Sequence, residues 1–116
     1  MNSRERFQQA LGIARTLVAD PTLNEDNVEA RVAELGGIST EDLKGKRRTI
    51  DRVYLRDIAC YFLNEGFGVS TTDIGVRMDG RDHSTIVHSV SKIRDELGTY
   101  RDLRDSLTKP QEQSYS

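Results

Sequence analysis

Apolar residues recur every three to four positions along most of the chain, a spacing that places them on one face of a helix. The pattern covers residues 7–18 and resumes in segments that start near residues 24, 51, 82 and 100. Ser39 and Ser70 each stand three positions before an aspartate, as in a capping box, and predict two further short helices. Strand-like alternation does not extend over any useful length. The sequence therefore predicts an all-α fold, a compact helical domain.

Glycine, proline and asparagine residues indicate where these helices begin and end. The first helix is expected to stop at Asp20-Pro21, and Asn24 is expected to cap the second. The second helix should carry Val28, Val32 and Leu35 on its apolar face and end at Gly36-Gly37. The other expected elements are a helix over 51–65 broken by Gly66 and Gly68, a short helix around Ile74 and Met78 that ends in the turn Asp79-Gly80, a helix over 82–97 ended by Gly98, and a last short helix with Tyr100, Leu103 and Leu107.

This pattern predicts four parts. They are an N-terminal helix over 1–22 for packing or partner contact, a helix-turn-helix domain over 23–98, a short C-terminal helix over 99–107, and a polar tail over 108–116 that we expect to be disordered.

Charge is distributed unevenly along the 116 residues. The chain carries a formal net charge of −2, which argues against binding to the phosphates of nucleic acid. Residues 44–94 nevertheless carry a net +4, and the acidic segments 1–43 and 95–116 lie on either side. The distribution therefore leaves DNA binding open, although the total alone does not suggest it.

Composition argues against several other classes of protein. Cys60 is the single cysteine and there are two histidines, so neither an intramolecular disulfide nor a catalytic metal is expected. Apolar runs are far too short for a membrane span, and the charged start of the chain does not resemble a secretory signal. We expect a cytoplasmic, nucleoid-associated protein that has no contact with membranes.

The segment 70–97 has the layout of a helix-turn-helix, with two helices joined by a three-residue turn. In the second helix, Ile86, Val90, Ile93 and Leu97 form one apolar stripe. The opposite stripe and the first turn hold side chains suited to reading base edges or contacting phosphates; these are Arg81, Asp82, His83, Ser84, Thr85, His88 and Lys92. The spacing alone also fits helical domains that never bind DNA. In that interpretation Asp82 is only an N-cap, Thr85 faces solvent and His88 is half-buried.

A basic loop over 44–48 precedes the helix that carries Arg52 and Arg56 one turn apart. Such a loop is often only a solvated surface. Beside a helix-turn-helix, however, an arginine arm can enter the minor groove, whose negative potential attracts it.

The run Gly80-Arg81-Asp82-His83-Ser84-Thr85-Ile86-Val87-His88, continued by Lys92-Ile93, resembles the signature of domain IV, the DNA-binding C-terminal domain of the bacterial replication initiator DnaA. Ile74-Gly75, Lys46-Arg47-Arg48 and Arg56 match other parts of that family's pattern, and the similarity covers about residues 24–97. The resemblance implies a helix-turn-helix fold of the Trp-repressor and initiator type. It implies base contacts by Arg48 in the minor groove and by Asp82, His83, Ser84 and Thr85 in the major groove, with the DNA backbone contacted by Lys46, Arg47, Arg56, Arg81, His88 and Lys92.

The chain departs from the family's pattern at several positions. Leu55 and Asp57 replace the usual proline and glutamine, Tyr54 and Thr72 are atypical, and Ser84 replaces a threonine. Asp57 places an acidic group where a backbone contact is expected and should weaken affinity for DNA. The loss of a methyl group at Ser84 should alter contact with a thymine methyl.

The phosphate-binding loop of the initiator's ATPase is not present: Gly45-Lys46 is the only Gly-Lys pair, and Thr40 stands where that loop's first glycine would be. We therefore expect no nucleotide, no cofactor and no catalysis. Asp82, His83 and Ser84 are the residue types of a catalytic triad, but consecutive side chains on one helix diverge by about 100°. The favoured hypothesis is a sequence-specific binder of double-stranded DNA that regulates replication or transcription. The alternative is a protein-interaction module whose apolar face over 7–18 forms a homodimer or binds a partner helix.

Overall fold

The computed structural model describes the backbone of residues 3–45 and 50–108 and the side chains of residues 4–45 and 52–106. Over these ranges every regular element is helical, so the all-α prediction is confirmed. The elements are α1 (Ser3–Ala19), α2 (Val28–Gly36), α3 (Thr40–Lys44), α4 (Ile50–Tyr61), a π-helical segment η1 (Phe62–Gly66), α5 (Thr71–Arg77), α6 (His83–Leu97) and α7 (Tyr100–Thr108).

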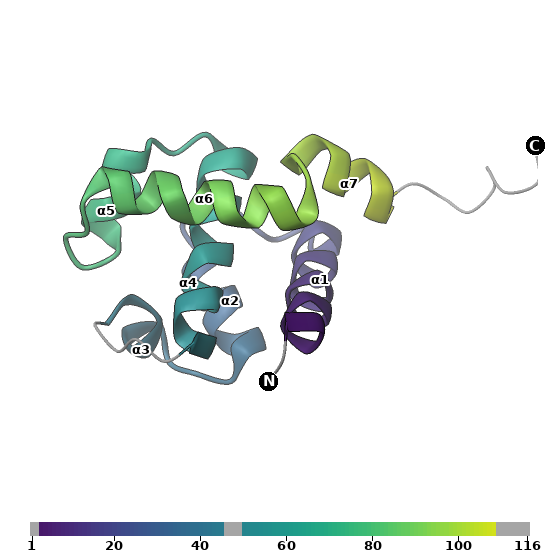
Figure 1. Ribbon diagram of the computed structural model, residues 1–116, viewed down its shortest axis with the longest axis horizontal. Helices are drawn as coiled ribbons and strands as arrows, with labels where there is room; N and C mark the ends of the chain where they lie inside the picture. Colours follow the sequence, from purple (N-terminus) through teal and green to yellow (C-terminus); the bar gives the residue numbers. More distant parts are fainter. Residues whose placement is uncertain (1–2, 46–49, 109–116) are drawn as a thin grey trace, which may run out of the picture.

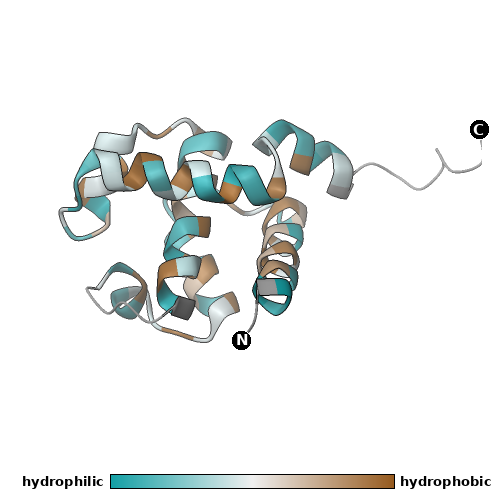
Figure 2. Ribbon diagram, in the orientation of Figure 1, coloured by the Kyte–Doolittle hydropathy of each residue, from teal (hydrophilic) through white to brown (hydrophobic). Residues whose placement is uncertain are grey.

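Helix α6 lies across one end of α1, α2 and α4, with α5 beside its N-terminal half and α7 at its C-terminal end (Figure 1). Hydrophobic residues recur along α1, α4 and α6 (Figure 2). One cluster of buried apolar side chains joins them; its fully buried members include Leu17, Val32, Leu43, Ile58, Phe62, Ile74, Met78, Ile86 and Ile93. The helix-turn-helix therefore packs on one side of a single core, and its orientation depends on the rest of the chain.

Two of the predicted helix starts are confirmed. The side-chain oxygens of Ser39 and Ser70 accept hydrogen bonds from the backbone N–H groups of Asp42 and Asp73, at 3.0 and 3.1 Å. Each bond satisfies one N–H group that the first helical turn would otherwise leave unpaired. These caps begin α3 and α5 at the predicted positions.

The start of α2 was predicted too early. The side chain of Asn24 accepts hydrogen bonds from the N–H groups of Asp26 and Asn27, so it caps a separate turn, and α2 begins at Val28. Leu35 was expected on the buried face but is 40% exposed. Val28 and Val32 are buried in the core, whereas Leu35, in the last turn of this short helix, lies at the edge of the core.

The helix expected over 51–65 has an irregular end. After Tyr61 it widens into the π-helical segment η1, where Phe62 and Leu63 are buried. Two hydrogen bonds close this segment: the Val69 N–H donates to the Leu63 carbonyl, and the Asn64 side chain donates to the Val69 carbonyl, at 3.0 and 2.9 Å. Hydrophobic spacing does not distinguish an α-turn from a π-turn, so the change was not predicted.

The apolar face of α1 is used inside the chain. Ala10, Ile13, Ala14 and Leu17 are buried in the core cluster, against the same elements that hold the helix-turn-helix. Helix α7 joins the cluster through Leu103, and the rings of Phe62 and Tyr100 meet edge to face, 5.5 Å between centroids. Of the two roles considered for residues 7–18, this arrangement favours packing over partner contact.

No helix within the described residues combines the length and apolar character needed to cross a membrane. Burial raises the pKa of the Cys60 thiol to about 12, with the nearby Asp57 carboxylate adding to the shift. This thiol therefore stays protonated at neutral pH and serves as a small apolar residue of the core.

Candidate nucleic-acid interface

Helices α5 and α6 form the predicted helix-turn-helix. Met78 ends α5 and Asp82 precedes α6, which leaves the expected three residues between the two caps. Asp79 and Gly80 both have positive φ values, 65° and 74°, so the Asp79-Gly80 turn is confirmed. Two successive left-handed residues reverse the chain tightly; glycine adopts this conformation readily and aspartate is one of the residues that tolerate it.

Gly75 holds the two helices at close range. Its carbonyl accepts a hydrogen bond from the N–H of Arg81 at 2.8 Å, across the turn. A Cβ atom at position 75 would lie 2.1 Å from the Arg81 carbonyl oxygen. Only a residue without a side chain allows this contact, and the contact fixes how α6 leaves the turn.

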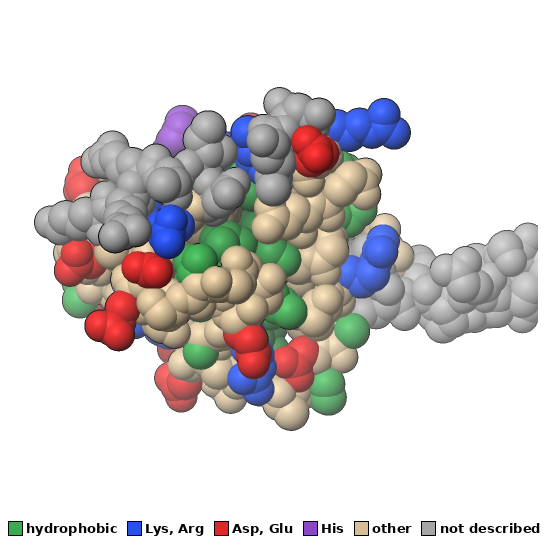
Figure 3. All heavy atoms as spheres, turned by 90° about the horizontal axis from the view of Figure 1, so that it is seen from below, with side chains coloured by type: hydrophobic (Ala, Val, Ile, Leu, Met, Phe, Trp, Pro, Cys, Tyr) green, Lys and Arg blue, Asp and Glu red, His purple; other side chains and the backbone are tan. Residues whose placement is uncertain are grey.

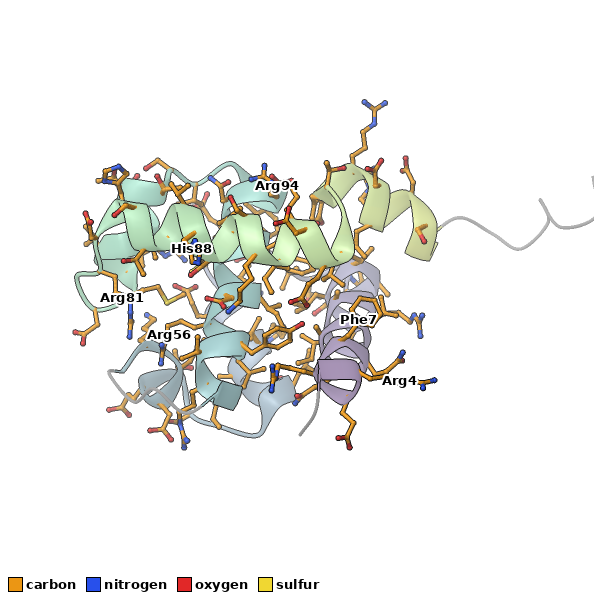
Figure 4. The ribbon with its side chains drawn as sticks, viewed as in Figure 1. Arg4, Phe7, Arg56, Arg81, His88 and Arg94 are labelled. Atoms are coloured by element: carbon orange, nitrogen blue, oxygen red, sulfur yellow. The ribbon has the colours of Figure 1, made fainter. Side chains whose placement is uncertain are left out.

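The first turn of α6 presents polar side chains to solvent. Asp82, His83, Ser84 and Thr85 are exposed, whereas Ile86, Val90 and Ile93 lie in the core. This separation follows from the i, i+4, i+7 spacing of the apolar residues and confirms the predicted two-faced helix. His88 is also exposed, which removes the possibility that it is half-buried (Figure 4).

Asp82 organises the residues around it. The Ser84 hydroxyl donates to the carboxylate at 2.5 Å, and the Nδ1 atom of His83 lies 3.6 Å from its other oxygen. The hydrogen bond from Ser84 lowers the pKa of Asp82, so Asp82 remains a charged acceptor. The side chains of Ser84 and His83 both turn toward Asp82. A catalytic triad would instead need the serine to hydrogen-bond to the histidine.

Arg81 binds backbone carbonyl groups within the protein. Its guanidinium donates to the carbonyl oxygens of Lys44, Gly45 and Met78, at distances of 2.8 to 3.0 Å. These bonds join the end of α3 to the turn before α6. Arg81 was expected along the DNA backbone, but here it anchors the chain where the basic segment begins (Figure 4).

Arg56 is buried between α4 and α3. It was expected to lie along DNA, but it is only 6% exposed, and its Nε atom donates to the Leu43 carbonyl at 2.6 Å. Arg52, one turn earlier, contacts the Asp42 carboxylate at 3.4 Å. Both arginines face α3 because α4 packs against it. The stripe that they share on α4 therefore lies at the contact between these two helices.

Lys92 and Asp57 also contact each other. The Lys92 ammonium lies 2.6 Å from a carboxylate oxygen of Asp57 and so bridges α6 to α4. Asp57 was expected as an acidic group on the DNA-facing surface, but its side chain is 6% exposed. It lines a pocket of about 130 Å³ between the two helices, together with Cys60, Thr85 and Ser89.

Three of the predicted contact residues, Lys46, Arg47 and Arg48, lie outside the described residues. The described residues contain no group of three or more His, Cys, Asp or Glu side chains placed to hold a metal ion. Sequence reasoning missed one ion pair that positions the interface: Arg77 of α5 contacts Glu29 of α2 through two hydrogen bonds, at 2.9 and 3.1 Å. These residues are 48 positions apart, and no spacing rule links them.

Comparison with known proteins decides the family. The family model described as "Bacterial dnaA protein helix-turn-helix" matches residues 26–93, more than half of the chain. The chain belongs to the DnaA helix-turn-helix family. Residues 26–93 include all of α5 and most of α6, so the DnaA-family match and the exposed polar turn coincide. Membership of this family supports DNA binding by the chain.

Curated relatives named "Chromosomal replication initiator protein DnaA" match the same region. The chain is 42% identical to the protein of Treponema pallidum (strain Nichols) over 76 residues, which are 66% of this chain and 16% of that protein. It is 34% identical to the protein of Limosilactobacillus reuteri (strain DSM 20016) over 92 residues, 79% of this chain and 21% of that protein. The chain thus spans about a fifth or less of these DnaA proteins. No solved structure gives a significant match.

Proposed function

We propose that this chain is a sequence-specific binder of double-stranded DNA that places the first turn of α6 in the major groove. The observation that carries the proposal is the exposed group Asp82, His83, Ser84 and Thr85, presented on a helix whose other face is locked into the core. Rigid presentation matters because base contacts depend on accurate geometry. The family match over residues 26–93 supports the same use of this helix.

Each exposed side chain of the turn has a chemical role that suits base edges. The charged Asp82 carboxylate can accept from a cytosine amino group, and His83 can donate to or accept from a purine. Ser84 is already bonded to Asp82, so its hydroxyl supports that carboxylate unless DNA offers a better acceptor. We assign the thymine methyl contact to Thr85.

Phosphate contacts are assigned more narrowly than the sequence suggested. His88 lies on the same stripe of α6 as Thr85 and is exposed, and Lys92 continues this stripe with its ammonium against Asp57. We propose that Lys46 and Arg47 contact phosphates and that Arg48 enters the minor groove. The burial of Arg56 and the carbonyl contacts of Arg81 favour roles in holding α3, and with it the start of the basic segment, beside α6.

Selection of bound duplexes from a random pool, with the full chain as bait, tests the function. An enriched motif resembling the initiator's box supports a role in regulating replication. Enrichment of an unrelated motif removes the replication role and directs the search to transcription. If the chain binds every sequence equally, sequence-specific recognition is wrong.

His83→Ala should weaken binding to the selected duplex by about 1–3 kcal/mol and change binding to a scrambled duplex much less. The reason is that a base contact contributes only where the right base is present. His88→Ala is the matched control, since we assign it to phosphate: it should weaken both duplexes alike. Fluorescence anisotropy at one fixed salt concentration measures all four affinities. Equal losses on the two duplexes for His83→Ala would remove it from base reading.

Arg48→Ala should likewise cost about 1–3 kcal/mol on the selected duplex, because a minor-groove arginine senses groove width as well as charge. Lys46→Ala, in the same segment, should weaken all duplexes to a similar extent. Binding isotherms on A·T-rich and G·C-rich duplexes distinguish the two residues. A loss for Arg48→Ala that is the same on both duplexes contradicts the minor-groove assignment.

A further inference from the structure

The side chain of Lys92 points back into the fold even though its backbone lies on the outward stripe of α6. Thr85, His88 and Lys92 follow one another at i, i+3 and i+7, and the first two are exposed. The Lys92 ammonium instead lies 2.6 Å from Asp57 and 6.0 Å from the centre of the Tyr54 ring. Lys92 therefore belongs to the outward stripe of α6 by position, while its charge lies against α4.

The Lys92 ammonium supplies a counter-charge to the buried Asp57 carboxylate. The Asp57 side chain is 6% exposed, and the Lys92 ammonium lies against its buried oxygen Oδ2. A buried carboxylate without a counter-charge is costly, so folding favours the state in which Lys92 stays bound. Lys92 itself is 40% exposed, which means that the ammonium can reach solvent once Asp57 releases it.

The contacts on either side keep the pair in register. Toward the C-terminus of α6, Glu96 accepts a hydrogen bond from the hydroxyl of Tyr54 on α4. Toward its N-terminus, Thr85 and Ser89 line the pocket that they share with Asp57 and Cys60. Helices α4 and α6 therefore meet along a continuous seam, and the ion pair is its central charged contact.

We propose that Asp57 is a positioning residue that lowers the affinity of this protein for the DNA backbone by neutralising Lys92. This inference rests on the proposed function, because it assumes that α6 faces a duplex. The pair has no net charge, so Lys92 releases no counterion from DNA while Asp57 holds it. Backbone contacts strengthen binding to all sequences alike, and withholding one leaves a larger share of the binding energy to base contacts.

Asp57→Asn tests the proposal, because asparagine keeps the shape and a hydrogen-bond acceptor but removes the charge. Affinities for the selected and scrambled duplexes are measured between about 50 and 200 mM salt. One additional phosphate contact should steepen the slope of log K against log salt by roughly 0.9, so the gain in affinity should fall about threefold over that range. The gain should be the same for both duplexes.

The double variant Asp57→Asn with Lys92→Met is the matched control. It replaces a neutral ion pair by two neutral side chains, so its salt slope should equal that of the unchanged protein. A steeper slope in the double variant would show that Asp57 acts through the overall field and not through Lys92, which overturns the proposal. If circular dichroism shows that Asp57→Asn does not fold, Asp57→Gln replaces it in both the single and the double variant.

Two results separate this inference from the function on which it rests. If the unchanged protein binds no duplex, the proposed function fails, and this inference fails with it. If the unchanged protein binds DNA and Asp57→Asn folds but leaves the slope unaltered, only the role assigned to Asp57 is wrong.

Discussion

Gly75→Ala is expected to destabilise the protein by about 3 kcal/mol and to abolish binding to the selected duplex at concentrations where the unchanged protein is saturated. The new Cβ would lie 2.1 Å from the Arg81 carbonyl oxygen, a backbone atom that no rotamer change can move. The Arg81 N–H is bonded to Gly75, so the turn must open to relieve the clash. Opening it displaces the whole first turn of α6.

Gly12→Ala is the matched control for this experiment. A Cβ at position 12 of α1 would meet no atom within 4 Å, and alanine favours a helix more than glycine does. Urea unfolding followed by circular dichroism should show Gly12→Ala unchanged or more stable by about 0.5–1 kcal/mol. A Gly75→Ala protein that unfolds at the same urea concentration as the unchanged protein would show that the turn tolerates a wider separation of α5 and α6.

Predictions from the sequence were correct where a side chain bonds to the backbone only a few residues away. Ser39 and Ser70 cap the helices that they were predicted to cap, and Asp79-Gly80 forms the predicted turn. Asn24 shows the limit of such reasoning. It makes the expected kind of hydrogen bond, but to a turn that precedes α2, because a capping residue specifies that N–H groups are bound and not that a helix continues.

The exposed residues of the candidate interface were predicted well for the same local reason. The spacing of Ile86, Val90 and Ile93 determines which face of α6 is buried, and so leaves Asp82 to Thr85 and His88 in solvent. The roles of the arginines were not predictable in this way. Whether Arg56 faces DNA or the Leu43 carbonyl depends on where α3 packs, which is a tertiary contact that no local pattern encodes.

The net charge of +4 over residues 44–94 overstates the positive surface of the described protein. Several of its cations are bound to acidic groups or carbonyls of the chain itself: Arg52 to Asp42, Arg77 to Glu29, Lys92 to Asp57, Arg94 to Glu65, and Arg81 to three carbonyl oxygens. On the described part of the face in Figure 3, acidic and basic side chains are interspersed. Affinity for the DNA backbone should therefore depend strongly on the basic residues 46–48, and base contacts should carry much of the specificity.

The second large effect is expected at Arg77, whose replacement by methionine should cost about 3 kcal/mol of stability. Arg77 joins α5 to α2 through paired hydrogen bonds to Glu29, which is only 4% exposed, and these bonds raise the pKa of the arginine. Methionine retains much of the apolar packing but leaves the Glu29 carboxylate buried, with the Lys44 ammonium 4.0 Å away. A buried charge that loses its principal partner is far more costly than a pair that was never formed.

Arg31→Met is the control for Arg77→Met, because it breaks an ion pair of similar length that lies nearer the surface. Arg31 contacts Asp20 at 3.2 Å with 37% of its side chain exposed, so its loss should cost less than about 1 kcal/mol. Replacing Glu29 by methionine together with Arg77 should restore most of the stability, since no buried charge then remains. Urea unfolding of the unchanged protein and the three variants measures each step. If Arg77→Met costs no more than Arg31→Met, Glu29 is solvated, and the attachment of α5 to α2 must come from apolar packing alone.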